Sequence, residues 1–208
     1  MNIIFRHCKW NKLHILLLLS IFVFTSCSVR SVQIKRAENR YKKGQYLASK
    51  GEVDRAIVNF EKSIRMARAV DFKEGVAHNL NELAIIHTGK GDTEKAREFL
   101  MEALDIYKEL NMKPEVSKTL NNIALTYVKD KKFQEAIKWF NELIEWDKKS
   151  GNQLGVGITF YNMALIYHKH LGMKKEAKDS LMKALRIFKE TGNEKYIQMI
   201  QDKIKKNH

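Results

Sequence analysis

The chain has 208 residues, of which 44% are hydrophobic, and this suits one domain or one repeat array with a buried core. The 38 lysine and arginine residues outnumber the 24 aspartate and glutamate residues, giving a formal net charge of +14. Cys8 and Cys27 are the only cysteines, so the composition excludes an internal disulfide framework.

Residues 1–26 have the pattern of an export signal. A basic start without any acidic residue precedes an apolar run of ten residues, from Ile15 to Phe24. A membrane-spanning helix needs about 20 residues, so this run has the length of a signal-peptide core instead. We therefore expect residues 1–26 to be a signal peptide.

The apolar run ends in Phe-Thr-Ser-Cys, which places small residues directly before Cys27. This ending resembles the lipobox of bacterial lipoproteins, with Phe24 in the place of the usual leucine. The resemblance implies that Cys27 is lipidated and becomes the mature N-terminus, with residues 27–35 as a tether. The alternatives are a plain secretory signal with an incidental cysteine, or an uncleaved anchor. The lipoprotein interpretation places the protein in the bacterial cell envelope, and Ser28 favours the outer membrane in a Gram-negative organism.

The residues that follow this anchor are strongly basic. The basic residues are Arg30, Lys35, Arg36, Arg40, Lys42 and Lys43, and the only acidic residue among them is Glu38. Near an anionic leaflet each basic residue contributes about 1 kcal/mol to membrane binding. We therefore expect this cluster to lie on the membrane; the alternative is an ordinary lysine-rich surface.

The rest of the chain repeats itself with a step of 40 residues. Two series of alanines follow this step: Ala84, Ala124 and Ala164, and Ala56, Ala96 and Ala136. Ala177 continues the second series one residue late, because the turn before it is one residue longer. Apolar and small residues recur around these alanines at spacings of three and four, which predicts two amphipathic helices in each repeat. We expect the alanines to lie where helices touch, because a small side chain lets two helices approach closely.

The order of a small residue, an aromatic residue, a turn glycine and then Ala-x-x-x-Phe/Leu-x-x-Ala/Leu resembles the tetratricopeptide repeat. The resemblance implies an all-α fold: an α-solenoid of four helix-turn-helix units in residues 36–191, followed by a C-terminal capping helix in residues 192–208. We expect the units at about 37–70, 77–110, 117–150 and 157–191. The step exceeds the common 34 residues and resembles a longer variety, also found in kinesin light chains and bacterial peptide-sensing regulators.

The first helix of each pair should line the inner wall of the solenoid, so residues beside the core stripe should face a groove. The predicted groove residues are Asn81, Asn121, Asn122, Tyr161 and Asn162. A carboxamide both donates and accepts hydrogen bonds, so a row of asparagines could hold the backbone of a peptide segment. The resemblance implies the same, because long-period relatives carry ligand-contacting asparagines at matching positions. The alternative is that these asparagines cap and bridge neighbouring helices.

Cationic residues are expected along the same wall. They are Lys118, Lys129, Lys169, His78 and His168. Such residues favour an acidic segment or a chain-terminal carboxylate as the partner. The alternative is that these residues form an ordinary solvated surface.

The sequence has no phosphate loop, no paired-cysteine metal site and no His-Glu-x-x-His motif. His168 and His170 lie in a predicted turn, and we interpret them as solvent-exposed histidines rather than metal ligands. We therefore expect no enzymatic activity, no cofactor and no metal. We also expect no nucleic-acid binding, because the basic residues spread over all units without interleaved aromatic residues.

Two functions remain after these exclusions. The first is a membrane-anchored scaffold or assembly factor that holds proteins of an envelope machine, such as a pilus, secretion or outer-membrane complex. The second is a sensor or regulator whose groove captures a short peptide. A folded partner found by crosslinking would favour the first function, and saturable binding of short peptides would favour the second. Tetratricopeptide repeats serve many pathways, so the fold alone does not decide between them.

Overall fold

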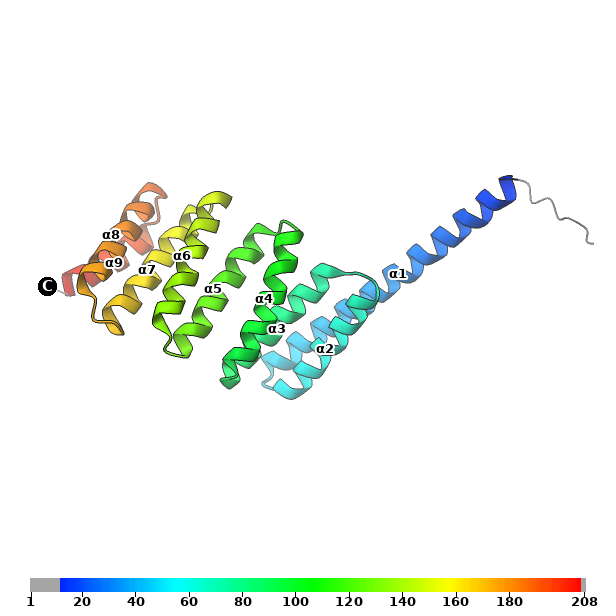
Figure 1. Ribbon diagram of the computed structural model, residues 1–208, viewed down its shortest axis with the longest axis horizontal. Coiled ribbons are helices and arrows are strands. Elements are labelled where there is room, and N and C mark those ends of the chain that lie inside the picture. Colours follow the sequence, from blue (N-terminus) through cyan, green and yellow to red (C-terminus); the bar gives the residue numbers. More distant parts are fainter. Residues whose placement is uncertain (1–11, 207–208) are drawn as a thin grey trace, which may run out of the picture. The chain divides into compact units, whose positions relative to one another are not determined.

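The computed structural model describes the backbone of residues 12–206 and the side chains of residues 28–203. Over this part the chain consists of α-helices joined by short turns (Figure 1). The predicted signal peptide lies partly outside the described residues, as does the side chain of Cys27, whose lipidation therefore remains a prediction. The chain divides into two compact units, Met1–Gly75 and Val76–His208.

The first unit contains α1 (Lys12–Ser49) and α2 (Val53–Ala69), which pack against each other. Phe60 lies at the centre of their contact and is fully buried. The centroid of its ring is 5.9 Å from that of the Tyr41 ring. Gly44 allows this approach, because a Cβ atom at Gly44 would lie 2.6 Å from the Phe60 ring. A polar contact adds to the packing, since the Ser63 hydroxyl donates to the carbonyl oxygen of Ala37 over 2.7 Å.

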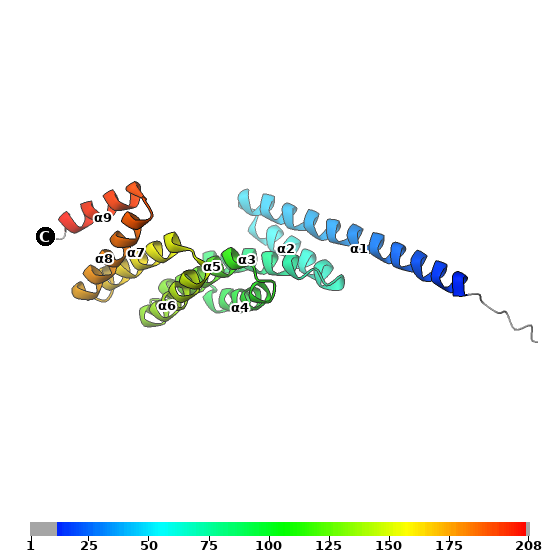
Figure 2. The ribbon, with the colours of Figure 1, turned by 90° about the horizontal axis from the view of Figure 1, so that it is seen from above.

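Helix α1 is one uninterrupted helix that extends past the end of α2 (Figure 2). The predicted tether, residues 27–35, is therefore helical, with a rise of about 1.5 Å per residue. No glycine or proline occurs between Lys12 and Lys43, so nothing in this sequence breaks the helix. Among the described residues, no helix is long and apolar enough to cross a membrane.

The second unit continues the pattern of antiparallel helices, each joined to the next by a tight turn (Figure 1). Its helices are α3 (Lys73–Lys90), which begins in the last residues of the first unit, α4 (Thr93–Glu109), α5 (Lys113–Lys129), α6 (Phe133–Ser150), α7 (Gln153–Lys169), α8 (Lys174–Glu190) and α9 (Glu194–Lys206). The turns contain residues with positive φ about every 20 residues, including Gly91, Asn111, Lys131 and Gly151. Each such residue ends one helix and reverses the chain, which sets the helix length.

The two alanine series lie where the sequence predicted helix contacts. Ala84, Ala96, Ala124 and Ala136 are fully buried. Small side chains at these positions let neighbouring helices approach closely, so the predicted packing role of these alanines is confirmed. The all-α fold, with paired helices of the tetratricopeptide type and a final helix, is confirmed as well.

Helix α9 covers the apolar side of the last helix pair. The ring of Phe188 in α8 stacks on Tyr196 in α9 at a centroid distance of 4.6 Å, and Ile200 is fully buried. These residues belong to an apolar cluster that also contains Ala164, Leu181, Ala184 and Leu185. An apolar face that a further repeat would otherwise cover is thus closed by α9.

Candidate functional site

The candidate site is one face formed by equivalent positions of α3, α5 and α7, which we call the α3–α5–α7 face. On α5, each of the residues Lys118, Asn121, Asn122, Leu125 and Lys129 lies three or four positions from another member of the set, so they share one side of the helix. The 40-residue step gives the members on the other two helices: Asn81 and Ile85 on α3, and Tyr161, Asn162, Leu165 and Lys169 on α7.

Two polar contacts hold α3 and α5 side by side in this register. The side-chain amide of Asn122 donates to the Asn81 carboxamide oxygen over 3.2 Å. The Lys129 ammonium group donates to the carbonyl oxygens of Thr88 and Gly89, the second over 3.3 Å. Both contacts join residues 40 or 41 positions apart, so they place equivalent positions of two consecutive repeats next to each other. Lys129 thus binds carbonyl groups near the end of α3, where the Thr88 oxygen also accepts from the backbone N–H of Gly91.

The predicted asparagines therefore differ in their roles. Asn81 is only 6% exposed and is bonded to Asn122, so this pair bridges two helices, which was the alternative role for these residues. Asn121 and Asn162 are half-buried on the same face, where their carboxamides can reach a bound segment. Asn122 is half-buried as well, with one amide hydrogen directed at Asn81.

The predicted cations also separate into two groups. Lys118, Lys169 and His168 are exposed, and they can attract an acidic segment. Lys129 is exposed too, but its ammonium group is occupied by α3. His78 lies in the packing between α3 and α4, where its Nδ1 atom is 2.9 Å from the hydroxyl of Tyr107.

Tyr161 lies where α9 meets the face. Its ring is half-buried and packs against the apolar cluster that contains Phe188. The Lys203 ammonium group of α9 lies 5.6 Å from the centroid of this ring. The α7 end of the face is therefore partly occupied by the chain itself, and the α3 and α5 part is the more open one.

An exposed apolar row on this face was not predicted from the sequence. Ile85 is 47% exposed and Leu125 is 43% exposed, while Leu165 at the equivalent position is half-buried. Each of these residues directly follows a repeat alanine, one position away from the core stripe. The sequence did contain a signal for this row. An apolar residue recurs in these three repeats at a position that faces away from the core in a regular helix.

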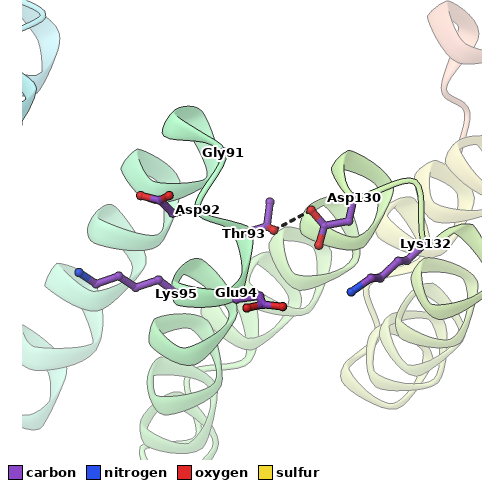
Figure 3. A pocket seen from close by; sticks show the side chains of 7 residues that line it. All are labelled: Gly91, Asp92, Thr93, Glu94, Lys95, Asp130 and Lys132. Carbon is purple, nitrogen blue, oxygen red and sulfur yellow. Dashed lines mark hydrogen bonds between the residues drawn. The ribbon is translucent and has the colours of Figure 1, made fainter.

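A second feature lies at the turns between α3 and α4 and between α5 and α6. It is an open depression of about 630 Å³ lined by Gly91, Asp92, Thr93, Glu94, Lys95, Asp130 and Lys132 (Figure 3). The Thr93 hydroxyl donates to one Asp130 carboxylate oxygen over 2.6 Å, and the Arg97 guanidinium donates to the other over 2.8 Å.

This carboxylate is held in its charged form by its neighbours. Burial opposes ionisation of Asp130, but the hydrogen bonds from Thr93 and Arg97 outweigh it, so its pKa lies below the ordinary value. Both carboxylate oxygens are occupied by α4, which makes the cluster a contact between consecutive repeats rather than a site for a ligand.

Metal ligation has no support in the described part of the chain, where no three His, Cys, Asp or Glu residues gather in a way that could hold an ion. The ring of His170 stacks on Phe133 with a centroid distance of 4.4 Å. His168 is exposed.

Residues 35–109 and 115–190 each match the family model described as tetratricopeptide repeat. No curated protein matches the sequence. Among solved structures, aspartyl phosphate phosphatase F from Bacillus subtilis is similar with a TM-score of 0.71 and 15% identity, over 81% of this chain and 44% of that one.

A Rap protein complexed with competence and sporulation factor is similar with a TM-score of 0.56 and 19% identity, over 76% of this chain and 44% of that one. The chain thus spans less than half the length of either structure. At these identities the likeness shows the fold alone.

Proposed function

This chain belongs to the tetratricopeptide repeat family, and we propose that it is a lipid-anchored protein of the bacterial cell envelope that binds a segment of another protein on its α3–α5–α7 face. The family fold supports a role in protein–protein interaction. The observation that carries the proposed site is the exposed apolar row, with Ile85 and Leu125 at equivalent positions of two helices in contact.

The chemistry of the face indicates what kind of segment it takes. Burying the exposed halves of Ile85 and Leu125 would contribute about 1 kcal/mol each. Asn121 can pair with both a donor and an acceptor of the segment's backbone. Because Lys118 and Lys169 are exposed beside this row, an acidic segment with a few apolar residues fits the face better than a basic one.

The anchor is supported by the Phe-Thr-Ser-Cys ending of the apolar run at Cys27. More than one acyl chain on that cysteine would give stable membrane attachment. Intact-mass analysis of the protein extracted from membranes tests this part. The mass of an acylated chain beginning at Cys27 supports the anchor, and an unlipidated chain with another N-terminus contradicts it.

Site-specific photocrosslinking tests the binding face. A photoreactive phenylalanine analogue is placed at Leu125 or, as the matched control, at Met101, an exposed apolar residue of α4 outside the face. Both variants are produced in bacterial cells, irradiated and purified from membranes. We expect adducts from position 125 and few from position 101, and adducts at 125 should weaken when Lys118 and Lys169 are changed to glutamate.

The adduct also separates the two possible functions. A crosslinked folded protein supports the scaffold or assembly role, whereas a short peptide supports the sensor or regulator role. Equal crosslinking at both positions, or crosslinking at Met101 alone, would contradict the proposed face.

A further inference from the structure

The side of α1 that points away from α2 carries basic and apolar residues together. We call this the outer face of α1 and define it by Lys35, Arg36, Lys42, Lys43, Val32 and Tyr46. At 3.6 residues per turn these six positions fall within about a third of the helix circumference. All six are exposed, and the buried residues Ala37 and Gly44 lie on the other side, toward α2. The stretch contains a single acidic residue, Glu38, which falls outside this arc.

The structure separates these residues from the other basic residues of α1. The Arg30 guanidinium donates to the carbonyl oxygens of Val70 and Asp71 over 3.1 and 3.4 Å, so it holds α1 against the end of α2. The Arg40 guanidinium donates to Asn59 of α2 over 3.4 Å. Two of the six residues that the sequence assigned to a membrane-facing cluster thus brace the helix pair, and four remain on the outer face.

The apolar members of this face are unusually open. Tyr46 is 61% exposed and Val32 is 48% exposed on a helix whose outer side is otherwise charged or polar. Water does not favour such exposure, whereas a membrane interface accepts valine side chains and tyrosine rings among lipid headgroups. Basic side chains beside them would then meet lipid phosphates.

We propose that the outer face of α1 binds the surface of an anionic lipid membrane. The proposal rests on the proposed envelope location, but not on the lipid at Cys27. Lys35, Arg36, Lys42 and Lys43 bind the negative headgroups, and Val32 and Tyr46 insert at the level of the headgroups. Electrostatic attraction of about 1 kcal/mol per basic residue makes four such residues sufficient for measurable binding.

The test uses a version of the chain that begins at Ser28. The contacts of α1 with α2 described above involve Arg30, Ala37, Tyr41 and later residues, which this version keeps. Circular dichroism with thermal unfolding checks that it folds. This version contains no cysteine, so it cannot carry the Cys27 lipid. Failure of surface binding is therefore distinguishable from failure of the anchor, which the mass measurement on the full protein decides.

The first measurement is sedimentation with vesicles of phosphatidylcholine alone or with phosphatidylglycerol added. Binding should require phosphatidylglycerol and should weaken as salt is raised. Changing Lys35, Arg36, Lys42 and Lys43 together to glutamine should weaken binding at least about tenfold. The matched control changes four exposed basic residues of α2 to glutamine: Arg55, Lys62, Arg65 and Arg68. It removes the same charge from a different helix, and its binding should fall much less.

The second measurement locates the apolar contact. Tyr46→Cys and Val58→Cys each supply the only thiol of this version, and each is labelled with an environment-sensitive fluorophore. Both positions are exposed, but Val58 lies on the side of α2 that points away from α1. We expect a blue shift on anionic vesicles at position 46 and none at position 58. Equal binding to both kinds of vesicle, equal losses in the two glutamine variants, or a shift at position 58 alone would overturn the proposal.

Discussion

The middle and the end of the second unit hold their helices together in different ways. Between α3, α4 and α5 polar contacts join helices that also share a buried apolar core: Asn122 with Asn81, and Arg97 and Thr93 with Asp130. At the end, between α7, α8 and α9, the contacts are apolar and centre on Phe188. This difference determines which residues of the α3–α5–α7 face stay exposed in each region.

In the middle, α3 and α5 align through contacts at their sides and at their turns, so the outward residues Ile85 and Leu125 stay exposed. At the end, α9 lies over the apolar cluster, and Tyr161 is half-buried beneath it. Polar links fix the register of the middle repeats without covering the face, whereas at the end α9 adds apolar packing that covers part of it. The middle of the array therefore leaves its face more accessible than the end does.

The largest expected effect comes from removing the aromatic centre of the end region. Phe188→Ala deletes a fully buried ring that touches Tyr196 and approaches Gly157, where a Cβ atom would lie 2.7 Å from the ring. We expect the free energy of unfolding to fall by about 3–5 kcal/mol, measured by urea unfolding followed by circular dichroism. Met182→Ala removes an exposed side chain from the same helix, and its effect should stay within about 0.5 kcal/mol. Similar losses in the two variants would show that the end region isn't held by its apolar cluster.

Much of this architecture was predictable from the sequence because close helix contacts demand small residues. The alanines at steps of 40 marked those contacts, and Ala84, Ala124 and Ala136 are all fully buried. The turns were less readable. Asn111 and Lys131 adopt positive φ where glycine would be expected, since the two flanking helices determine the turn despite the local preference.

The candidate site was predicted in part. The asparagine row indicated the correct helix face, but sequence spacing could not show that Asn81 is buried and bonded to Asn122, because that contact joins two repeats. The same limit applies to Arg30 and Arg40, whose partners lie on α2. Helix periodicity predicts the face on which a side chain lies. Whether that side chain is bonded to a neighbouring helix depends on contacts between elements, which the periodicity does not show.

A smaller effect is expected from breaking the polar contact of the middle region. Arg97→Met keeps most of the side-chain volume but leaves Asp130 without its guanidinium donor, and it removes a cation that lies 4.5 Å from the Tyr127 ring centroid. We expect a loss of about 1–3 kcal/mol in the free energy of unfolding. The control is Arg186→Met, which breaks an exposed pair with Glu190 at 3.8 Å and should cost at most about 0.5 kcal/mol. If Arg97→Met loses as little stability as the control, the contact of Arg97 with Asp130 contributes no more than an ordinary exposed ion pair.

The smallest expected effect has the opposite sign and concerns Asp147, a carboxyl group packed between α5, α6 and α7. It is only 1% exposed, and one of its oxygens accepts a hydrogen bond from the Ser117 hydroxyl over 2.6 Å. Burial raises its pKa above the ordinary value of 3.8, and hydrogen bonds from Ser117 and Asn152 only partly offset this. The folded state therefore favours the neutral carboxyl group. The stability that the neutral Asp147 carboxyl group contributes is fully present below pH 3.8, and it is lost as the pH rises through the raised pKa.

Asp147→Asn cannot ionise, so it should be more stable than the unchanged protein at pH 7, by about 1 kcal/mol or about 2–4 °C in the melting temperature. This advantage should shrink as the pH is lowered toward 4. Asp130→Asn provides the contrast, because the pKa of Asp130 is lowered and its carboxylate stabilises the fold above the ordinary pKa. That variant should lose stability at pH 7, and its deficit should shrink in acid. Melting curves of both variants from pH 4 to pH 8 distinguish the two carboxyl groups. The charged form of Asp130 should stabilise the fold, and the charged form of Asp147 should destabilise it. If both substitutions shift the melting temperature in the same direction at pH 7, burial at Asp147 does not outweigh its hydrogen bonds.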